Sequence, residues 1–292
     1  MKYKKYLNAN YKWIKWITEI DSWKQGKTFW IFAINHGNEP VWLEVFQELE
    51  KYLETNNIVY GKILLIAVNI DAYTKYVNNN YDDSYRFIDD NMNRIWNKNI
   101  IETSSEWQRK WELLSIFDEI DIALDLHSVS EWNLKMLISD FSQKSVVNSI
   151  FDVEYTLFDD IENTWALISY FLKNNKIWFG IECWNHKSSE AFLTGFDAVK
   201  NMLLYYSFTN YKPESKLYNQ VHLGFHEEIF PTTNNFKFTK EYNSFTLLNK
   251  GEKFASDWEK EYRENTDFDL YIWLISHNVR VWDWAWFLFK KL

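Results

Sequence analysis

Four apolar segments of strand length, separated by segments with helical periodicity, constrain the fold of this chain most. They are TFWIFAIN (28–35), ILLIAVN (63–69), IDIALDL (120–126) and KIWFGIE (176–182). Strands that are hydrophobic along their whole length are typical of parallel sheets covered by helices on both faces. The alternation of strands and helices therefore predicts an α/β protein with a mixed, mainly parallel sheet flanked by helices.

Helices are predicted in the intervals between these strands. Pro40 precedes apolar residues at helical spacing, and proline suits the first turn of a helix. Similar spacing predicts helices near residues 104–118, 163–173 and 189–207. Residues 1–27 are interpreted as an N-terminal helix and loop.

The pattern of apolar residues and prolines in the sequence changes at about residue 210. Pro213, Pro231 and short alternating segments such as FTLLN and FDLYIWLI follow that point. Such alternation, broken by turn-forming residues, is typical of short antiparallel strands. We therefore predict an α/β domain over residues 1–209 and a smaller β-rich domain over residues 210–292.

Composition excludes several classes of partner. The formal net charge is −9 and no basic segment is present, which argues against nucleic acid because phosphate binding relies on clustered Lys and Arg. The apolar segments are shorter than the roughly 18 residues of a membrane span. A single cysteine, Cys183, and the lack of a secretory signal pattern favour a reducing compartment. The expectation is a soluble, cytoplasmic protein that acts on a small molecule.

Polar residues follow each of the four apolar segments. His36 and Glu39 follow the first, the loop segment RFIDDNMNR (86–94) comes after the second, His127 ends the third and Glu182 ends the fourth. In open α/β sheets, ligands bind outside the carboxyl ends of the parallel strands. We therefore expect these side chains to gather at one edge of one sheet.

Two histidines and one carboxylate form a three-ligand zinc site that leaves a fourth position for water. His36 and Glu39 lie three residues apart on a turn, and His127 would join them from a distant strand. Glu182 would then be available to take a proton from water and return it to a leaving nitrogen. Asp125, two residues before His127, is a candidate acceptor for the His127 ring.

The segments NHGNE, RFIDDNMNR, DLHS and GIECW together resemble the succinylglutamate desuccinylase/aspartoacylase family, which is related to zinc carboxypeptidases. The resemblance extends in order from about residue 28 to residue 200 and implies a zinc-carboxypeptidase-like catalytic domain. The family usually has an acidic residue at the position of Asn91. No arginine occurs in residues 163–181 to match a second carboxylate clamp of aspartoacylases.

The resemblance also implies a role for each site residue. Zinc, one ion per chain, would be held by His36, Glu39 and His127. Glu182 would be the general base and acid, and Arg86 would polarise the scissile carbonyl. The remaining pair, which would hold a substrate carboxylate, consists of Asn93 and Arg94. The implied activity is a zinc-dependent hydrolysis of the amide bond of an N-acyl amino acid.

Two other functions stay open from the sequence. One is a zinc carboxypeptidase acting on a peptide or an amino-acid conjugate, and the other is a protein that keeps zinc but only binds a ligand. The acyl group, the amino acid and the oligomeric state are not determined. Structural roles are expected for Cys183, a small buried thiol, and for the other histidines, which are His186, His222, His226 and His277.

Tryptophan and glycine occur in unusual numbers. The chain has 17 Trp and 7 Gly, whereas the usual glycine content of about 7% predicts roughly 20 glycines in a chain of this length. Several tryptophans stand where glycine would serve, including Trp42, Trp184, Trp258 and the alternating Trp282, Trp284 and Trp286. We hypothesise that many of these codons are UGA, which some bacterial lineages read as glycine. Trp96 is interpreted as a true aromatic residue.

Overall fold

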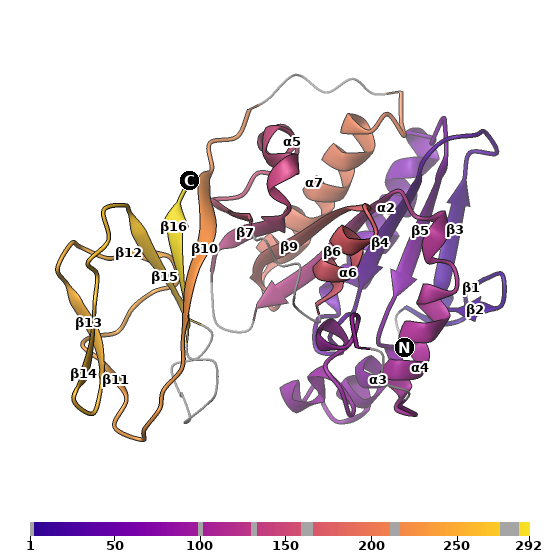
Figure 1. Ribbon diagram of the computed structural model, residues 1–292. Helices are drawn as coiled ribbons and strands as arrows, with labels where there is room; N and C mark the ends of the chain where they lie inside the picture. Colours follow the sequence, from indigo (N-terminus) through magenta and orange to yellow (C-terminus); the bar gives the residue numbers. More distant parts are fainter. Residues whose placement is uncertain (1–2, 99–101, 130–132, 159–165, 211–216, 275–285) are drawn as a thin grey trace. The chain divides into compact units, whose positions relative to one another are not determined.

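The computed structural model describes residues 3–98, 102–129, 133–158, 166–210, 217–274 and 286–292. The described residues form two compact units, one of residues 1–154 and 161–220 and the other of residues 155–160 and 221–292. Figure 1 labels the helices and strands along the chain. The division predicted at residue 209 stays a prediction.

The first unit contains most of the helices. Its elements are α1 (Lys4–Leu7), β1 (Asn10–Tyr11), β2 (Ile14–Lys15), β3 (Ile17–Asp21), β4 (Thr28–Ala33), α2 (Val41–Thr55), β5 (Lys62–Ala67), α3 (Ile70–Asn78), the 3-10 helices η1 (Asp83–Arg86) and η2 (Met92–Arg94), α4 (Ser105–Leu114), η3 (Phe117–Glu119), β6 (Ile122–Val129), β7 (Lys135–Ser139), η4 (Phe141–Gln143), α5 (Lys144–Ile150), α6 (Leu167–Lys173), β9 (Ile177–Asn185) and α7 (Ser189–Tyr205).

The sheet of the first unit has the strand order β7-β9-β6-β4-β5-β3. The four central strands β4, β5, β6 and β9 are mutually parallel, whereas β3 and β7 pair antiparallel with β5 and β9. These four strands are the four apolar segments of the sequence. The predicted fold class, a mixed and mainly parallel sheet flanked by helices, is therefore confirmed.

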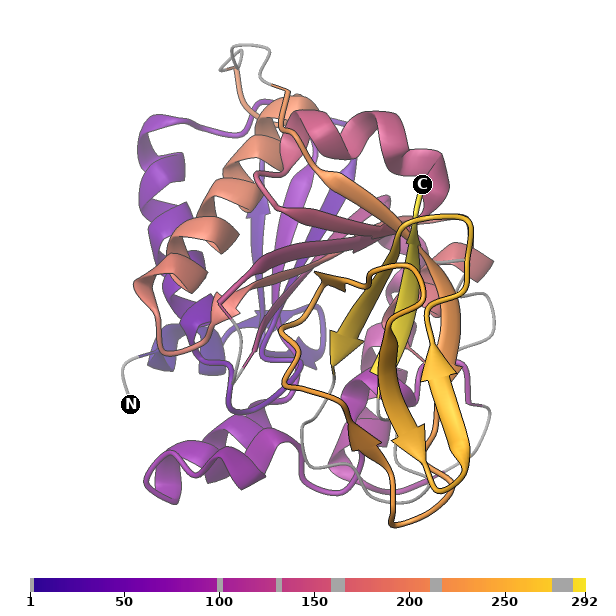
Figure 2. The ribbon, with the colours of Figure 1, turned by 90° about the vertical axis from the view of Figure 1, so that its left-hand side faces the viewer.

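Helices cover both faces of this sheet (Figure 2). Trp30 and Phe32 on β4 share one core cluster with Trp107 of α4 and Phe171 of α6. Side chains alternate along a strand, so the intervening residues of β4 belong to the opposite face. The helices α2 and α7 pack against each other through Tyr52 and Phe196. The continuous apolar composition of the central strands thus follows from burial on both sides.

The N-terminal prediction was wrong. Residues 1–27 contain one short helix followed by three short strands, and β3 forms the edge of the sheet beside β5. Ile17 is buried while Thr18, Glu19 and Ile20 are only partly so or exposed, because an edge strand buries only part of its surface. The short elements α3, α5 and β7 were not predicted from the sequence, because their formation depends on the neighbouring sheet.

The second unit consists of β strands. Its elements are β8 (Tyr155–Phe158), β10 (Val221–Ile229), β11 (Lys237–Phe238), β12 (Thr246–Leu247), β13 (Lys253–Asp257), β14 (Lys260–Arg263), β15 (Leu270–Leu274) and β16 (Trp286–Lys291). The strands pair in the orders β12-β15-β16-β10-β8 and β11-β13-β14. The β-rich character predicted for the C-terminal part of the chain is confirmed.

Among the described residues, no helix is sufficiently long and apolar to cross a membrane.

Candidate metal centre and active site

His36 and Glu39 lie on a tight turn between β4 and α2. Ile34, which follows β4, has a φ of 57°, a left-handed conformation that is strained for a β-branched residue. Gly37 is required by close packing, because a Cβ at this position would lie 2.5 Å from the backbone carbonyl carbon of Ala72 in α3. The turn is also tied to the end of η1, since the Gly37 N–H donates to the Arg86 carbonyl at 2.8 Å.

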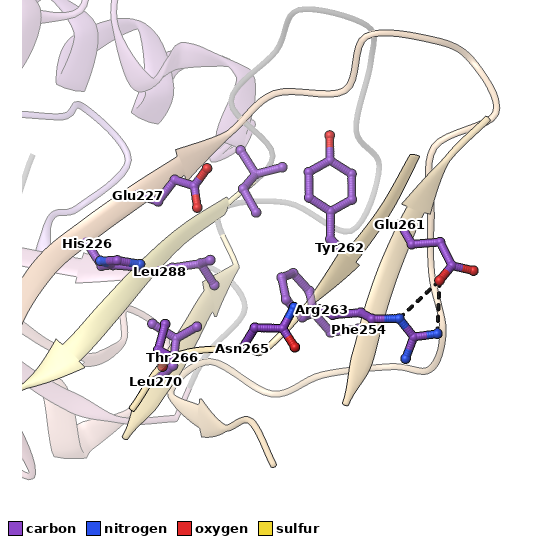
Figure 3. Close-up of a pocket in the computed structure, with 11 residues that line it drawn as sticks. His226, Glu227, Phe254, Glu261, Tyr262, Arg263, Asn265, Thr266, Leu270 and Leu288 are labelled. Carbon is purple, nitrogen blue, oxygen red and sulfur yellow. Dashed lines mark hydrogen bonds and ion pairs between the residues drawn. The ribbon is translucent and has the colours of Figure 1, made fainter. Parts of the chain in front are cut away.

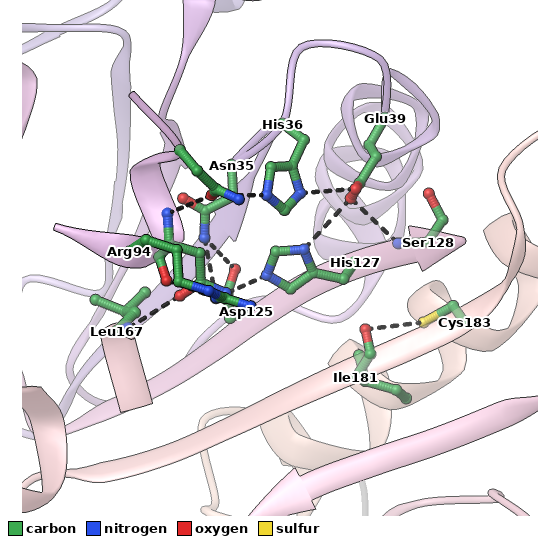
Figure 4. Close-up of polar contacts among 12 residues, drawn as sticks. Asn35, His36, Glu39, Arg94, Asp125, His127, Ser128, Leu167, Ile181 and Cys183 are labelled. Atoms are coloured by element: carbon green, nitrogen blue, oxygen red, sulfur yellow. Dashed lines mark hydrogen bonds and ion pairs between the residues drawn. The ribbon is translucent and has the colours of Figure 1, made fainter. Parts of the chain in front are cut away.

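Three side chains from this turn and from β6 converge on one point (Figure 4). Nδ1 of His36 lies 2.8 Å from Oε1 of Glu39, and Nδ1 of His127 lies 3.4 Å from Oε2 of Glu39. One ligand atom from each of the three residues lies within 4.8 Å of the others, and all three residues are buried. Within the described part of the chain, this triad is the one group of three or more His, Cys, Asp and Glu residues arranged to hold a metal ion.

The protonation states of the triad follow from burial and mutual charge. Burial, with the nearby Arg86 charge, lowers the pKa of His36 to about 3, so His36 is neutral and able to act as a ligand. Burial raises the pKa of Glu39, but His36 and His127 outweigh this effect and hold it well below its ordinary value. Burial lowers the pKa of His127, but Asp125 and Glu39 outweigh burial and raise it well above 6.5.

The outer nitrogen of each histidine faces a fixed oxygen. Nε2 of His127 lies 3.0 Å from Oδ2 of Asp125, in an ion-pair contact. Asp125 is held by Asn35, whose Nδ2 donates to both of its carboxylate oxygens at 2.9 and 3.0 Å. Nε2 of His36 lies 3.2 Å from Oδ1 of Asn91. Such outer contacts orient the rings and leave the Nδ1 atoms directed toward the centre of the triad.

Glu182 reaches the same region from β9. It pairs in register with His127 of β6, and its Oε2 is buried without a hydrogen-bond partner. Burial raises the pKa of Glu182 to about 7, and the Glu39 carboxylate adds to this effect while His127 and Arg86 oppose it. A buried carboxyl group with a pKa near neutrality has the property required of a general acid–base group.

The segment between α3 and α4 carries the two arginines that were predicted for the site, Arg86 and Arg94. NH1 of Arg86 donates to Oε1 of Glu39 at 3.1 Å, and its side chain is 40% exposed. Oδ1 of Asn93 accepts a hydrogen bond from the N–H of Leu167 at the start of α6. Arg94 is exposed, and its NH1 donates to the Asn93 carbonyl.

The buried Glu106 of α4 and the half-buried Asp90 of the loop hold this loop in place. Oε1 of Glu106 accepts from the Ile88 N–H at 2.7 Å and from Asn69 at 3.1 Å. Oδ2 of Asp90 accepts from Trp107 Nε1 at 3.0 Å. Asp90 therefore has a structural role, as expected for a loop residue.

Two contributors to the site could not be recognised from the sequence. Asn35 holds Asp125, and the backbone N–H of Ser128 donates to Oε2 of Glu39 at 3.1 Å. The HGNE pattern gave no signal for these residues, because their roles depend on contacts between distant segments.

Cys183, beside Glu182, is a buried thiol, and burial raises its pKa well above the ordinary value. A protonated, buried thiol is a poor nucleophile, which agrees with the structural role expected for it. The sequence also predicted that His186, His222, His226 and His277 are not ligands. The first three are not part of the triad, and His277 lies outside the described residues.

The second unit contains a pocket of about 340 Å³ (Figure 3). It is lined by apolar residues of the β strands and by His226, Glu227, Arg263 and Asn265. The Arg263 guanidinium is paired with Glu261 on its own strand. None of the triad residues lines this pocket. The candidate metal site is therefore separate from it.

The described residues thus define an α/β fold with a buried His–Glu–His triad arranged to hold a metal ion. Residues 25–146 match the model of the succinylglutamate desuccinylase/aspartoacylase catalytic domain. This match agrees with the family resemblance that the sequence motifs indicated, over the part of the chain that it covers.

Solved structures share the fold over nearly the whole chain. Succinylglutamate desuccinylase from Vibrio cholerae has a TM-score of 0.74 at 18% identity, covering 94% of this chain and 85% of the other. The enzyme from Vibrio parahaemolyticus has a TM-score of 0.73 at 17% identity, with 94% and 86% covered. The ectoine utilization protein EutE (DoeB) from Ruegeria pomeroyi, in a product-bound structure, has a TM-score of 0.67 at 16% identity, with 94% and 88% covered. A comparison with curated proteins found no match.

Proposed function

We propose that this protein is a zinc-dependent hydrolase that cleaves the amide bond of an N-acyl amino acid to a carboxylate and a free amine. The observation that carries this proposal is the pairing of the buried triad with Glu182 on the adjacent strand. A triad alone would support metal binding, whereas a carboxyl group with a pKa of about 7 beside it supports proton transfer.

The triad residues fit a zinc ion chemically. Two imidazoles and one carboxylate are ligands that zinc prefers in hydrolytic sites. Glu39 is ionised and His36 is neutral, as metal ligands must be. The raised pKa of His127 reflects two carboxylates around one imidazole, and a divalent cation would balance that excess of negative charge. When bound, zinc would lower the pKa of a water molecule and polarise a carbonyl group.

The protein's own residues supply the remaining steps. Glu182 takes a proton from the attacking water as the water oxygen bonds to the amide carbon, and it returns the proton to the leaving nitrogen as the C–N bond breaks. Arg86 has donors beyond the one that contacts Glu39, and it stabilises the negative charge that develops on the carbonyl oxygen. Asp125 and Asn91 keep the two histidine rings oriented throughout.

Substrate selection rests on the loop that carries Asn93 and Arg94. A guanidinium group binds a carboxylate through two parallel hydrogen bonds, and Arg94 is exposed. Oδ1 of Asn93 is engaged by Leu167, which directs its Nδ2 donor elsewhere. These two donors support recognition of the carboxylate of an amino acid.

The decisive experiment measures amine release from a panel of N-acyl amino acids, together with the zinc content of the purified protein. Release from substrates with a free α-carboxylate, and weaker release from their amides, is expected. Release only from peptides would favour the carboxypeptidase alternative. Zinc binding without any turnover would favour a binding protein. The substrates of the panel that are cleaved fastest identify the acyl group and the amino acid.

A further inference from the structure

Tryptophan is concentrated at backbone positions that favour glycine. Eleven non-glycine residues of the described chain have a positive φ, and four of them are tryptophans, although tryptophan makes up only 17 of the 292 residues. Side chains with a Cβ are disfavoured in this region, whereas glycine enters it readily. The four positions are Trp16, Trp23, Trp184 and Trp258.

The hairpin between β13 and β14 requires glycine most clearly. Asp257 pairs with Lys260, so Trp258 and Glu259 form a two-residue loop. Of these two, only Trp258 has a positive φ, at 56°. A two-residue hairpin with a positive φ at its first central residue matches the type II′ turn, which has glycine at that position. The Trp258 side chain is 69% exposed, so packing offers no compensation for the strain.

Position 184 lies in a β-bulge beside the proposed active site. Glu182 pairs with His127 and Asn185 pairs with Val129, so Cys183 and Trp184 together oppose one residue of β6. Trp184 has a φ of 98°, which lies beyond the left-handed helical region open to other residues. Glycine within a strand commonly marks such a bulge. The bulge directly follows Glu182, the last residue before the register between the two strands shifts.

We propose that positions 23, 184 and 258 are glycine in the natural protein, because their codons are UGA read as glycine. Trp16 is not included, because its ring is occupied by the Arg109 guanidinium, 5.3 Å from the ring centroid. The strain at these positions adds a structural argument that is independent of the composition. It does not apply to Trp42, which is fully buried in α2, and Trp282 and Trp284 lie outside the described residues. With glycine at position 184, the bulge beside Glu182 forms without strain.

The test begins with the gene and with protein purified from the source cells. UGA codons at positions 23, 184 and 258 are expected, together with peptides whose masses contain glycine there. Trp107 is the internal control, because it lies in a regular helix and its indole N–H donates to Asp90, so a UGG codon is expected. UGG codons at the three positions, or UGA codons with tryptophan in the peptides, would overturn the proposal.

A second measurement compares the thermal unfolding of variants of the chain that contains all 17 tryptophans. Trp258→Gly and Trp184→Gly should each raise the thermal midpoint, because they relieve a disfavoured φ. The matched variant Trp107→Gly should lower it, because it removes a buried side chain from a helix. Equal losses of stability in all three variants would contradict the inference that positions 184 and 258 need glycine.

Discussion

His127 and Glu182 stand opposite each other in the neighbouring parallel strands β6 and β9. Their backbones are therefore held at a fixed separation by the hydrogen bonds of the sheet, and neither position depends on a mobile loop. A candidate metal ligand and a candidate base are thus placed together by the most rigid part of the fold. This arrangement allows metal binding and proton transfer to be tested separately.

Removal of one ligand should release the metal. We expect about one zinc ion per chain in the unaltered protein and substantially less in His127→Ala, since two protein ligands remain. Elemental analysis of the purified proteins measures this. His226→Ala, which alters a histidine outside the triad, should retain its zinc. Full zinc occupancy in His127→Ala would exclude it as a ligand.

The outer partner of His127 should tune zinc affinity. Asp125 lies 3.0 Å from Nε2 of His127. The substitution Asp125→Asn preserves the shape of this side chain but removes its negative charge. Outer-shell substitutions typically weaken metal affinity by about 10- to 100-fold, and we expect a loss in this range. Competition with a chelator measures the affinity, and an unchanged affinity would show that Asp125 has no influence on the metal.

Glu182→Gln should keep zinc and lose activity. Proton transfer by a positioned side chain contributes at least ~10²-fold to the rate, and glutamine cannot perform it. The measurement is the turnover rate on the best substrate of the panel, with zinc content determined on the same sample. Glu190→Gln, on the exposed first turn of α7, is the control and should remain active. Full activity of Glu182→Gln would place the base elsewhere.

Arg94→Ala should mainly raise KM. A clamp on the substrate carboxylate acts in the ground state and the transition state alike, so its loss affects binding more than turnover. Arg94→Lys should recover only part of the affinity, because a lysine does not reproduce the two parallel hydrogen bonds. Steady-state kinetics on an N-acyl amino acid and on its amide test this. An equal effect of Arg94→Ala on both substrates would argue against carboxylate recognition.

A carboxylate of the second unit should make stability depend on pH. The hydrogen bond from Lys240, with further bonds from Asn249 and Tyr242, lowers the pKa of Glu252 from 4.5 to about 2. Because the folded-state pKa is depressed, the stabilisation is fully present above pH 4.5 and is lost as the pH falls through about 2.

Glu252→Gln should therefore cost about 1 kcal/mol of unfolding free energy at pH 6, as for a partly exposed ion pair. The difference in unfolding free energy between this variant and the unaltered protein should decrease toward pH 2. Urea unfolding at several pH values measures it, with Glu259→Gln in the adjacent hairpin as the control. A difference that is constant with pH would show that charge is not the cause.

The sequence by itself determined the parallel strands and the edge of the sheet where the site lies. Both are local properties, because burial on two faces demands continuous apolar segments and the carboxyl ends of parallel strands share one edge. His36, Glu39, His127 and Glu182 could therefore be selected from their places in three short motifs. The composition also indicated that several tryptophans occupy positions suited to glycine.

Only the tertiary structure decided which atoms meet. The contacts of Asn35 with Asp125 and of Asn91 with His36 join segments far apart in the chain, and no local pattern encodes them. The same holds for the edge strand β3, whose formation depends on β5, and for the bulge at Trp184, where the pairing of two strands sets the backbone angle. Long-range pairing fixes such details because many weak local preferences are overridden by the packing of the whole sheet.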